Sequence, residues 1–100
     1  MLCTEVSYLY RDASNYKTRG RFVCKGRLSM DDIRHHLFDS EFFIPGKLGL
    51  PSLAPDRPGR DDHLLHEIEE LQPVEQDRYD LPAEDFVALA AAACAEGWFR

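Results

Sequence analysis

The hydrophobic and polar positions of residues 17–28 alternate with a period of two. Basic side chains occupy every second position except Val23, and small or apolar side chains fill most of the positions between them. We call the basic positions the basic row: Lys17, Arg19, Arg21, Lys25 and Arg27. Because successive side chains of a strand point to opposite faces of its sheet, this alternation predicts a strand with one buried and one charged face.

A second strand is predicted just before the first. Residues 4–10, TEVSYLY, are rich in β-branched and aromatic residues, which strands favour. The RDASN sequence that follows suits a turn, because Asp, Ser and Asn side chains bond their own backbone. An odd-length loop of about residues 12–16 would place Tyr8 over Gly20 and join the two apolar faces. In that register Cys3 and Cys24 point to opposite faces, so no disulfide is expected between them.

Two segments have the chemistry of helix starts. Ser29 and Asp32 have the spacing of a capping box, which predicts a short helix near 29–38. Near the C-terminus, Asp80 is expected to cap a helix near 82–96, with acidic residues in its first turn and a glycine after its end. The apolar face of this second helix is predicted to contain Phe86, Leu89, Ala90 and Ala93.

The middle of the chain is less regular. Residues 42–44 favour a short strand that Pro45 would end, and residues 45–60 contain four prolines and three glycines. Loops this long in small domains are usually functional or mobile, but three leucines predict that this one is held against the core. In residues 61–71 the apolar positions favour a helix over a strand, because they do not alternate cleanly.

Three segments together resemble a group of short bacterial proteins for which no activity is assigned. The shared patterns are YLYRDxxNYK, EFFIPxxLGLPxL and DDHxxHE, found here at 8–17, 41–53 and 61–67. The resemblance implies that residues 65–71 form a strand, against the helical pattern. It also implies that the turn near residue 12 and the DDHxxHE segment lie close together.

These elements predict one small α+β domain spanning residues 1–100. An antiparallel sheet would combine the N-terminal hairpin with one or two further strands, and the two helices would pack beside it. One hundred residues suffice for a single core, and 44% hydrophobic with 30% charged residues is typical of a globular chain. No apolar run approaches the roughly 20 residues of a membrane span, and the N-terminus lacks the features of a signal peptide, so we expect a cytoplasmic protein without membrane partners.

The charge of −6 is unevenly distributed. Residues 1–50 hold eight Lys/Arg against six Asp/Glu, whereas residues 51–100 hold four against twelve. Such a division favours binding of a protein partner or of a second copy, and it argues against general nucleic-acid binding. The three cysteines form no CxxC motif, and no sequence pattern indicates a cofactor.

The DDHxxHE segment is the main candidate for chemistry. His66, Glu67 and Asp62 could form a histidine–carboxylate site, and His63, His66 and Asp62 could contribute to a metal site. The spacing matches neither HExxH nor HxxEH, so the favoured interpretation is that Asp62 and His66 anchor the long loop through hydrogen bonds.

The remaining candidates are binding surfaces. Arg11, Asp12 and Asn15 place polar groups on the hairpin turn, and the basic row could contact an acidic protein surface or, less favourably, nucleic acid or an anion. The favoured function is a small non-catalytic protein-binding or regulatory module, with a small hydrolase or metal-dependent enzyme as the alternative.

Overall fold

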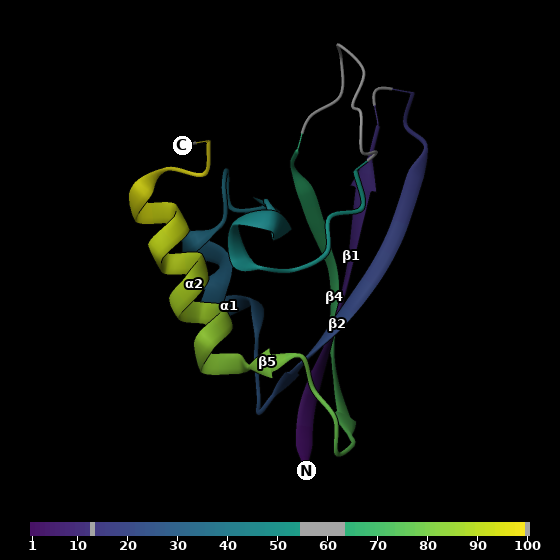
Figure 1. The fold of residues 1–100 in the computed structure, drawn as a ribbon, viewed down its shortest axis with the longest axis vertical. Helices are drawn as coiled ribbons and strands as arrows, with labels where there is room; N and C mark the ends of the chain where they lie inside the picture. Colours follow the sequence, from purple (N-terminus) through teal and green to yellow (C-terminus); the bar gives the residue numbers. More distant parts are fainter. Residues whose placement is uncertain (13, 55–63, 100) are drawn as a thin grey trace.

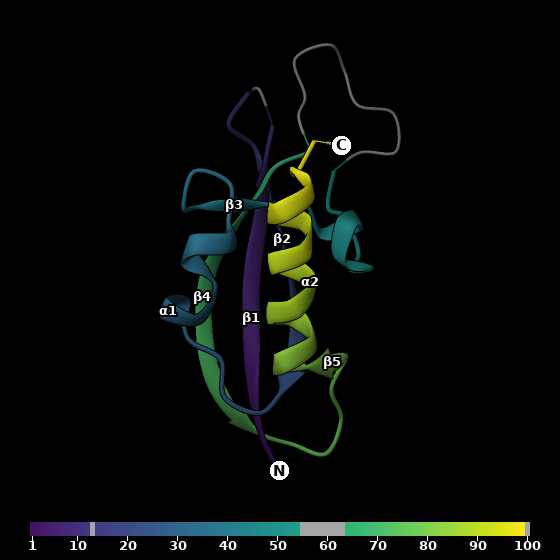
Figure 2. The same cartoon turned by 90° about the vertical axis from the view of Figure 1, so that its left-hand side faces the viewer.

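Five strands form one curled sheet, and both α-helices lie on the same side of it (Figures 1 and 2). The computed structural model describes residues 1–12, 14–54 and 64–99. The strand order is β3-β4-β1-β2-β5. In chain order the elements are β1 (Leu2–Arg11), β2 (Lys17–Lys25), α1 (Met30–Ile33), η1 (Arg34–His36), β3 (Phe42–Phe43), η2 (Pro45–Leu48), β4 (His66–Glu75), β5 (Leu81–Pro82) and α2 (Ala83–Glu96). The α+β class predicted from the sequence is confirmed.

The N-terminal hairpin has the predicted register. Residues 12–16 separate β1 from β2, Val6 lies opposite Phe22, and Tyr8 lies opposite Gly20. A Cβ atom on Gly20 would come within 2.8 Å of the Leu53 side chain and 3.4 Å of the Tyr8 ring. Glycine at this position therefore lets the end of the Leu53 side chain lie directly on the strand, and with a larger residue that side chain would have to move.

Strand β4 confirms the expectation drawn from the resemblance and shows that the helix predicted from the apolar pattern is wrong. Tyr8 pairs with Ile68, but Ser7 pairs with Glu70, so Glu69 is an extra residue in β4. This β-bulge turns Leu71 to the same face as Ile68, and both side chains pack on the core. A regular strand would have placed them on opposite faces, which is why their spacing looked helical.

Helix α1 begins as predicted but is short. The Ser29 backbone N–H donates to the Asp32 carboxylate at 2.9 Å, as in a capping box. The α-helix ends at Ile33 and continues as the 3-10 turn η1, so only the first half of the predicted 29–38 helix is α-helical.

Helix α2 covers the inner face of the sheet (Figure 2). Phe86, Ala90 and Ala93 are buried as predicted, whereas Leu89 is 39% exposed, so its assignment to the buried face was wrong. The predicted cap was also wrong, because Pro82 holds the N-cap position. The Trp98 ring folds back, and its Nε1–H donates to the His36 carbonyl at 2.9 Å.

Two short strands complete the sheet. The predicted strand β3 pairs antiparallel with the first residues of β4, and Pro45 follows it in η2. Strand β5 pairs in parallel with the end of β2, a contact that the sequence did not predict. In the described part of the chain, no helix is long and apolar enough to cross a membrane.

Candidate functional site

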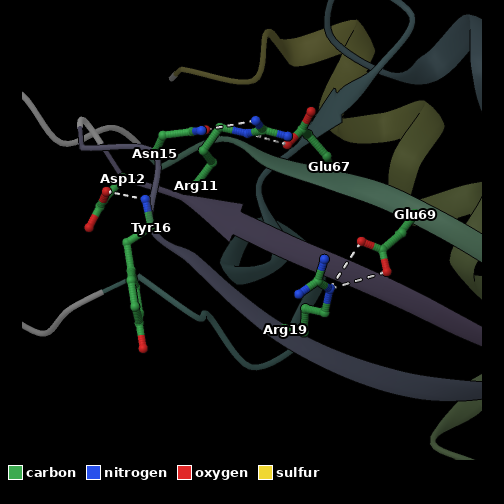
Figure 3. A network of polar contacts seen from close by, with 7 residues as sticks. All are labelled: Arg11, Asp12, Asn15, Tyr16, Arg19, Glu67 and Glu69. Carbon is green, nitrogen blue, oxygen red and sulfur yellow. Dashed lines mark hydrogen bonds and ion pairs between the residues drawn. The ribbon is translucent and has the colours of Figure 1, made fainter.

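The hairpin turn is held by its own side chains (Figure 3). The Asp12 Oδ1 atom accepts backbone N–H groups from Ser14 and Tyr16, both at 2.9 Å. Asn15 has a positive φ of 66°, a conformation that asparagine tolerates better than most residues. The Asn15 side-chain oxygen accepts a hydrogen bond from Arg11 Nη1 at 2.7 Å. These bonds hold the described residues of the turn, 12 and 14–16, and leave Tyr16 72% exposed.

Arg11 also connects the turn to β4. Its Nε atom donates to a Glu67 carboxylate oxygen at 3.3 Å (Figure 3). Glu67 is the last residue of the DDHxxHE segment, so this end of the segment lies beside the turn as expected, while residues 61–63 lie outside the described residues. The central motif joins the same region, because Phe42 and Phe43 of β3 pair with Glu67 and His66.

The outer face of the sheet, opposite the helices, carries a set of ion pairs. Arg19 Nε lies 3.2 Å from Glu69 Oε2, and Arg21 Nη1 lies 3.7 Å from Glu5 Oε1. The Arg19–Glu69 pair joins β2 to β4 across the central strand β1 (Figure 3). A hollow of about 290 Å³ beside it is lined by Ser7, Arg19, Gly20, Arg21 and Glu69. The bulge that aligns Ile68 and Leu71 on the inner face thus also provides the carboxylate that meets Arg19.

The basic row does not form one uniform cationic surface. Arg19 and Arg21 have carboxylate neighbours, and Lys25 Nζ lies 5.7 Å from the centre of the Tyr79 ring. Lys17 and Arg27 are exposed. The arginine side chains remain largely in solvent, with 60% of Arg19 and 73% of Arg21 exposed, so their ion pairs are readily exchanged for others.

His66 is buried and bonded to backbone at both ring nitrogens. Its Nε2 atom accepts the Leu53 N–H at 3.0 Å, and its Nδ1–H donates to the Leu64 carbonyl at 2.9 Å. These contacts select the neutral tautomer with the proton on Nδ1. The predicted anchoring of the long loop is therefore made by His66, while Asp62 lies outside the described residues.

The structure does not bring the proposed acid–base pair together. His66 points into the core between Tyr10 and Phe43, with ring centroids at 5.2 and 6.1 Å, whereas Glu67 lies on the outer face with Arg11. His63, like Asp62, lies outside the described residues. Among residues 1–12, 14–54 and 64–99, no three His, Cys, Asp or Glu side chains are grouped closely enough to hold a metal ion.

The cysteines lie in different surroundings. Cys3 and Cys24 are buried, Cys94 is exposed, and all three are free thiols. Burial raises the pKa of the Cys24 thiol to about 12, with the charges of Asp80 and Cys3 adding to the effect. A thiol with such a pKa is a poor nucleophile at neutral pH.

Tyr16 is the surface residue that the sequence indicated least clearly. It lies in the turn motif, but only the fold shows that the neighbouring Arg11, Asp12 and Asn15 are occupied in hydrogen bonds while the Tyr16 side chain is exposed. No protein-family model, curated protein or solved structure gives a significant match to this chain.

Proposed function

We propose that this chain is a small non-catalytic protein-binding or regulatory module. Its contact surface, the binding face, would comprise the hairpin turn and the outer side of β1 and β2. Both α-helices pack on the other side of the sheet, so this face carries no helix from the described residues (Figure 1). It presents arginine and tyrosine side chains, two of the residue types most enriched where proteins bind one another.

The observation that carries this proposal is the conformation of the turn. Asp12 and Asn15 fix the backbone, and Arg11 fastens it to β4, so binding would require little further ordering of the loop. The exposed Tyr16 ring has few rotatable bonds and a large contact area. Hydrogen-bonded turn residues that display an exposed aromatic side chain support recognition rather than a purely structural connection.

Two other functions receive less support. Within the described part of the DDHxxHE segment the histidine is His66, and both of its ring nitrogens are bonded to backbone, which does not favour a role as a catalytic base. Nucleic-acid binding would use the basic row, but the chain as a whole carries a net charge of −6, which opposes binding of a long polyanion. We also propose a cytoplasmic location, which the three free thiols support because the cytosol is reducing.

Site-specific photo-crosslinking tests the proposal. A photoreactive amino acid is placed at Tyr16, and in a separate protein at Leu89 on α2, and both are irradiated in lysate of the source cells. Since the proposed binding face contains Tyr16, we expect one defined protein adduct from this position and none of that size from Leu89. Mass spectrometry identifies the adduct and the crosslinked residue.

Charge reversal provides the second arm of the test. The double change Arg19→Glu and Arg21→Glu should reduce the Tyr16 adduct at least about tenfold, because it reverses the charge at the centre of the binding face. Arg34→Glu is the matched control, since Arg34 is an exposed arginine with an ion pair to Asp31 on α1. An adduct unchanged by the double substitution would exclude this face as the interface.

A further inference from the structure

The edge of β2 that faces away from β1 is only partly filled. Strand β5 pairs with Cys24 and Lys25 alone. One residue earlier, the Val23 N–H donates to the Asp80 carboxylate and the Val23 carbonyl accepts the Asp80 N–H, both at 2.8 Å. Both backbone groups of Val23 therefore point to this edge and not to β1.

The direction of the Val23 backbone groups fixes the direction of the N–H and C=O groups at every second residue of β2. In an antiparallel pair, alternate residues direct their N–H and C=O groups to the same side. Lys17, Arg19 and Arg21 consequently present their backbone groups to the same edge as Val23. No residue in the described part of the chain pairs with this stretch on that side, which leaves a free edge of about 17 Å over residues 17–21.

The opposite edge of the sheet differs in kind. Beyond its short pairing with β3, strand β4 contains Pro73, which has no N–H to donate, and the bulge at Glu69. Both features obstruct the addition of another strand. The free part of β2 has neither: it contains no proline and keeps a regular register with β1. The free edge of β2 is thus the better template for strand addition.

We propose that the free edge of β2 binds an extended, acidic segment of the partner protein as an additional strand. This inference rests on the proposed function and specifies how the partner would bind. Alternate side chains of the added strand would lie beside Lys17, Arg19 and Arg21 on the outer face, where carboxylates are favoured. The side chains between them would lie beside Thr18 and Gly20 on the inner face, where Leu53 provides an apolar contact.

Two features of the chain support an acidic occupant. The chain already fills part of this edge with a carboxylate, that of Asp80, which accepts the edge-directed N–H of Val23. The exposed ion pairs of Arg19 and Arg21 are weak enough that carboxylates of an added strand can replace or share them.

A second copy of the chain fits this edge poorly. Two β2 edges paired antiparallel would place the basic side chains of residues 17–21 beside one another, which is destabilising. Pairing of β2 with β4 of another copy would meet Pro73 and the bulge. The charges on β2 therefore act against self-association and leave an acidic partner as the favoured occupant.

A peptide experiment tests the mode of binding. The probe is a capped peptide of alternating glutamate and valine, long enough to span the free edge, titrated into the intact protein by NMR. The control peptide has the same sequence with its alternate edge-facing amides N-methylated, which keeps the charge but removes the hydrogen-bond donors. We expect the first peptide alone to bind and to slow amide exchange at Arg19 and Arg21.

Two substitutions at one position separate charge from backbone pairing. Arg19→Ala removes the charge and keeps the N–H, so we expect a loss of affinity of a few-fold. Arg19→Pro also removes the edge-directed N–H while sparing the β1 ladder, so we expect a further loss of at least about tenfold. Thermal unfolding of both variants verifies that the β1–β2 hairpin remains folded.

The inference and the proposed function can fail separately. Equal binding of the two peptides, equal affinities of the Ala and Pro variants, or no binding of either peptide would overturn strand addition. The proposed function would survive these results if the Tyr16 adduct still depends on Arg19 and Arg21. A Tyr16 adduct whose yield is unchanged by Arg19→Glu and Arg21→Glu would instead overturn the proposed function, independently of the peptide results.

Discussion

At the scale of single residues, His66 determines how the central loop meets the sheet. The ring accepts the Leu53 N–H and donates to the Leu64 carbonyl, so it joins two backbone segments that flank the Pro- and Gly-rich loop. The Tyr8 hydroxyl donates to the Pro51 carbonyl at 2.7 Å in the same region. His66, which the sequence placed in a possible catalytic cluster, thus instead makes hydrogen bonds that join the two ends of the loop to the sheet.

Replacing His66 by phenylalanine tests this structural role. The change His66→Phe keeps an aromatic ring in the core but leaves the buried Leu53 N–H without its acceptor. We expect the free energy of unfolding to fall by about 1–3 kcal/mol in urea denaturation. His35→Phe is the control, because His35 is exposed, and it should change stability by less than about 0.5 kcal/mol. A fully stable His66→Phe protein would contradict the role assigned to the ring.

Gly20 provides a second test at this scale. In Gly20→Ala the new methyl group would meet the flexible end of the Leu53 side chain at 2.8 Å, which would have to move, so we expect a loss of up to about 1 kcal/mol. In a Leu53→Ala background the same change should cost much less, because the obstructing atoms are gone. A double-mutant cycle measures this coupling, and strictly additive effects would show that Leu53 does not lie on Gly20.

At the scale of elements, the segment before α2 illustrates how one residue can serve two local roles. Aspartate is a residue type that often caps helix N-termini, and the sequence alone favours that role for Asp80, two residues before Pro82. In the fold Asp80 instead bonds both backbone groups of Val23 and ends the free edge of β2. Only the tertiary position of β2 distinguishes these outcomes.

Asp80→Ala should therefore loosen β2 and not α2. We expect a loss of about 1–3 kcal/mol in the free energy of unfolding, because the Val23 N–H loses its acceptor. Amide hydrogen exchange should accelerate at Val23 while the first turn of α2 is unchanged. Asp80→Asn keeps an acceptor oxygen and should recover part of the stability. If amide hydrogen exchange in Asp80→Ala is faster only in the first turn of α2, Asp80 acts as a helix cap and not as a partner of Val23.

At the scale of the whole molecule, the features that the sequence predicted are those set by local pattern. The hairpin register followed from the alternation of residues 17–28 and from the length of the turn, and the start of α1 followed from its capping box, whereas the predicted cap of α2 was wrong. The β4 bulge could not be derived in this way. Its extra residue, Glu69, breaks the alternation that identifies a strand, and only pairing with β1 shows why.

The candidate site was predictable to a similar extent. The basic row and the turn residues were recognised by composition, and the structure adds the carboxylates that face them. Those partners come from β4 and β1, at sequence separations of 50 residues for Arg19–Glu69 and 56 for Arg11–Glu67. Neither pairing has a local signal, and the free edge of β2 depends on where β5 ends.

The buried thiol of Cys24 makes the stability of the whole molecule sensitive to alkaline pH. Its pKa rises from 9.0 to about 12 in the fold, so above pH 9 the unfolded chain releases a proton that the native chain retains. The free energy of unfolding should therefore fall between pH 9 and 12, by up to about 1.4 kcal/mol per pH unit from this group. Burial also raises the pKa of Tyr8, which adds a decline of the same sign.

Substitution of Cys24 isolates its share of this decline. Urea denaturation under reducing conditions, repeated at intervals from neutral pH to about pH 11, gives the slope for each protein. Cys24→Ala should have a shallower slope than the unmodified chain, although its stability at neutral pH is lower because a core side chain is truncated. Cys94→Ala, at an exposed position, should retain the original slope. Equal slopes for all three proteins would mean that the Cys24 thiol ionises as readily in the fold as in the unfolded chain, and that the inner face of the sheet is more open to water than its packing indicates.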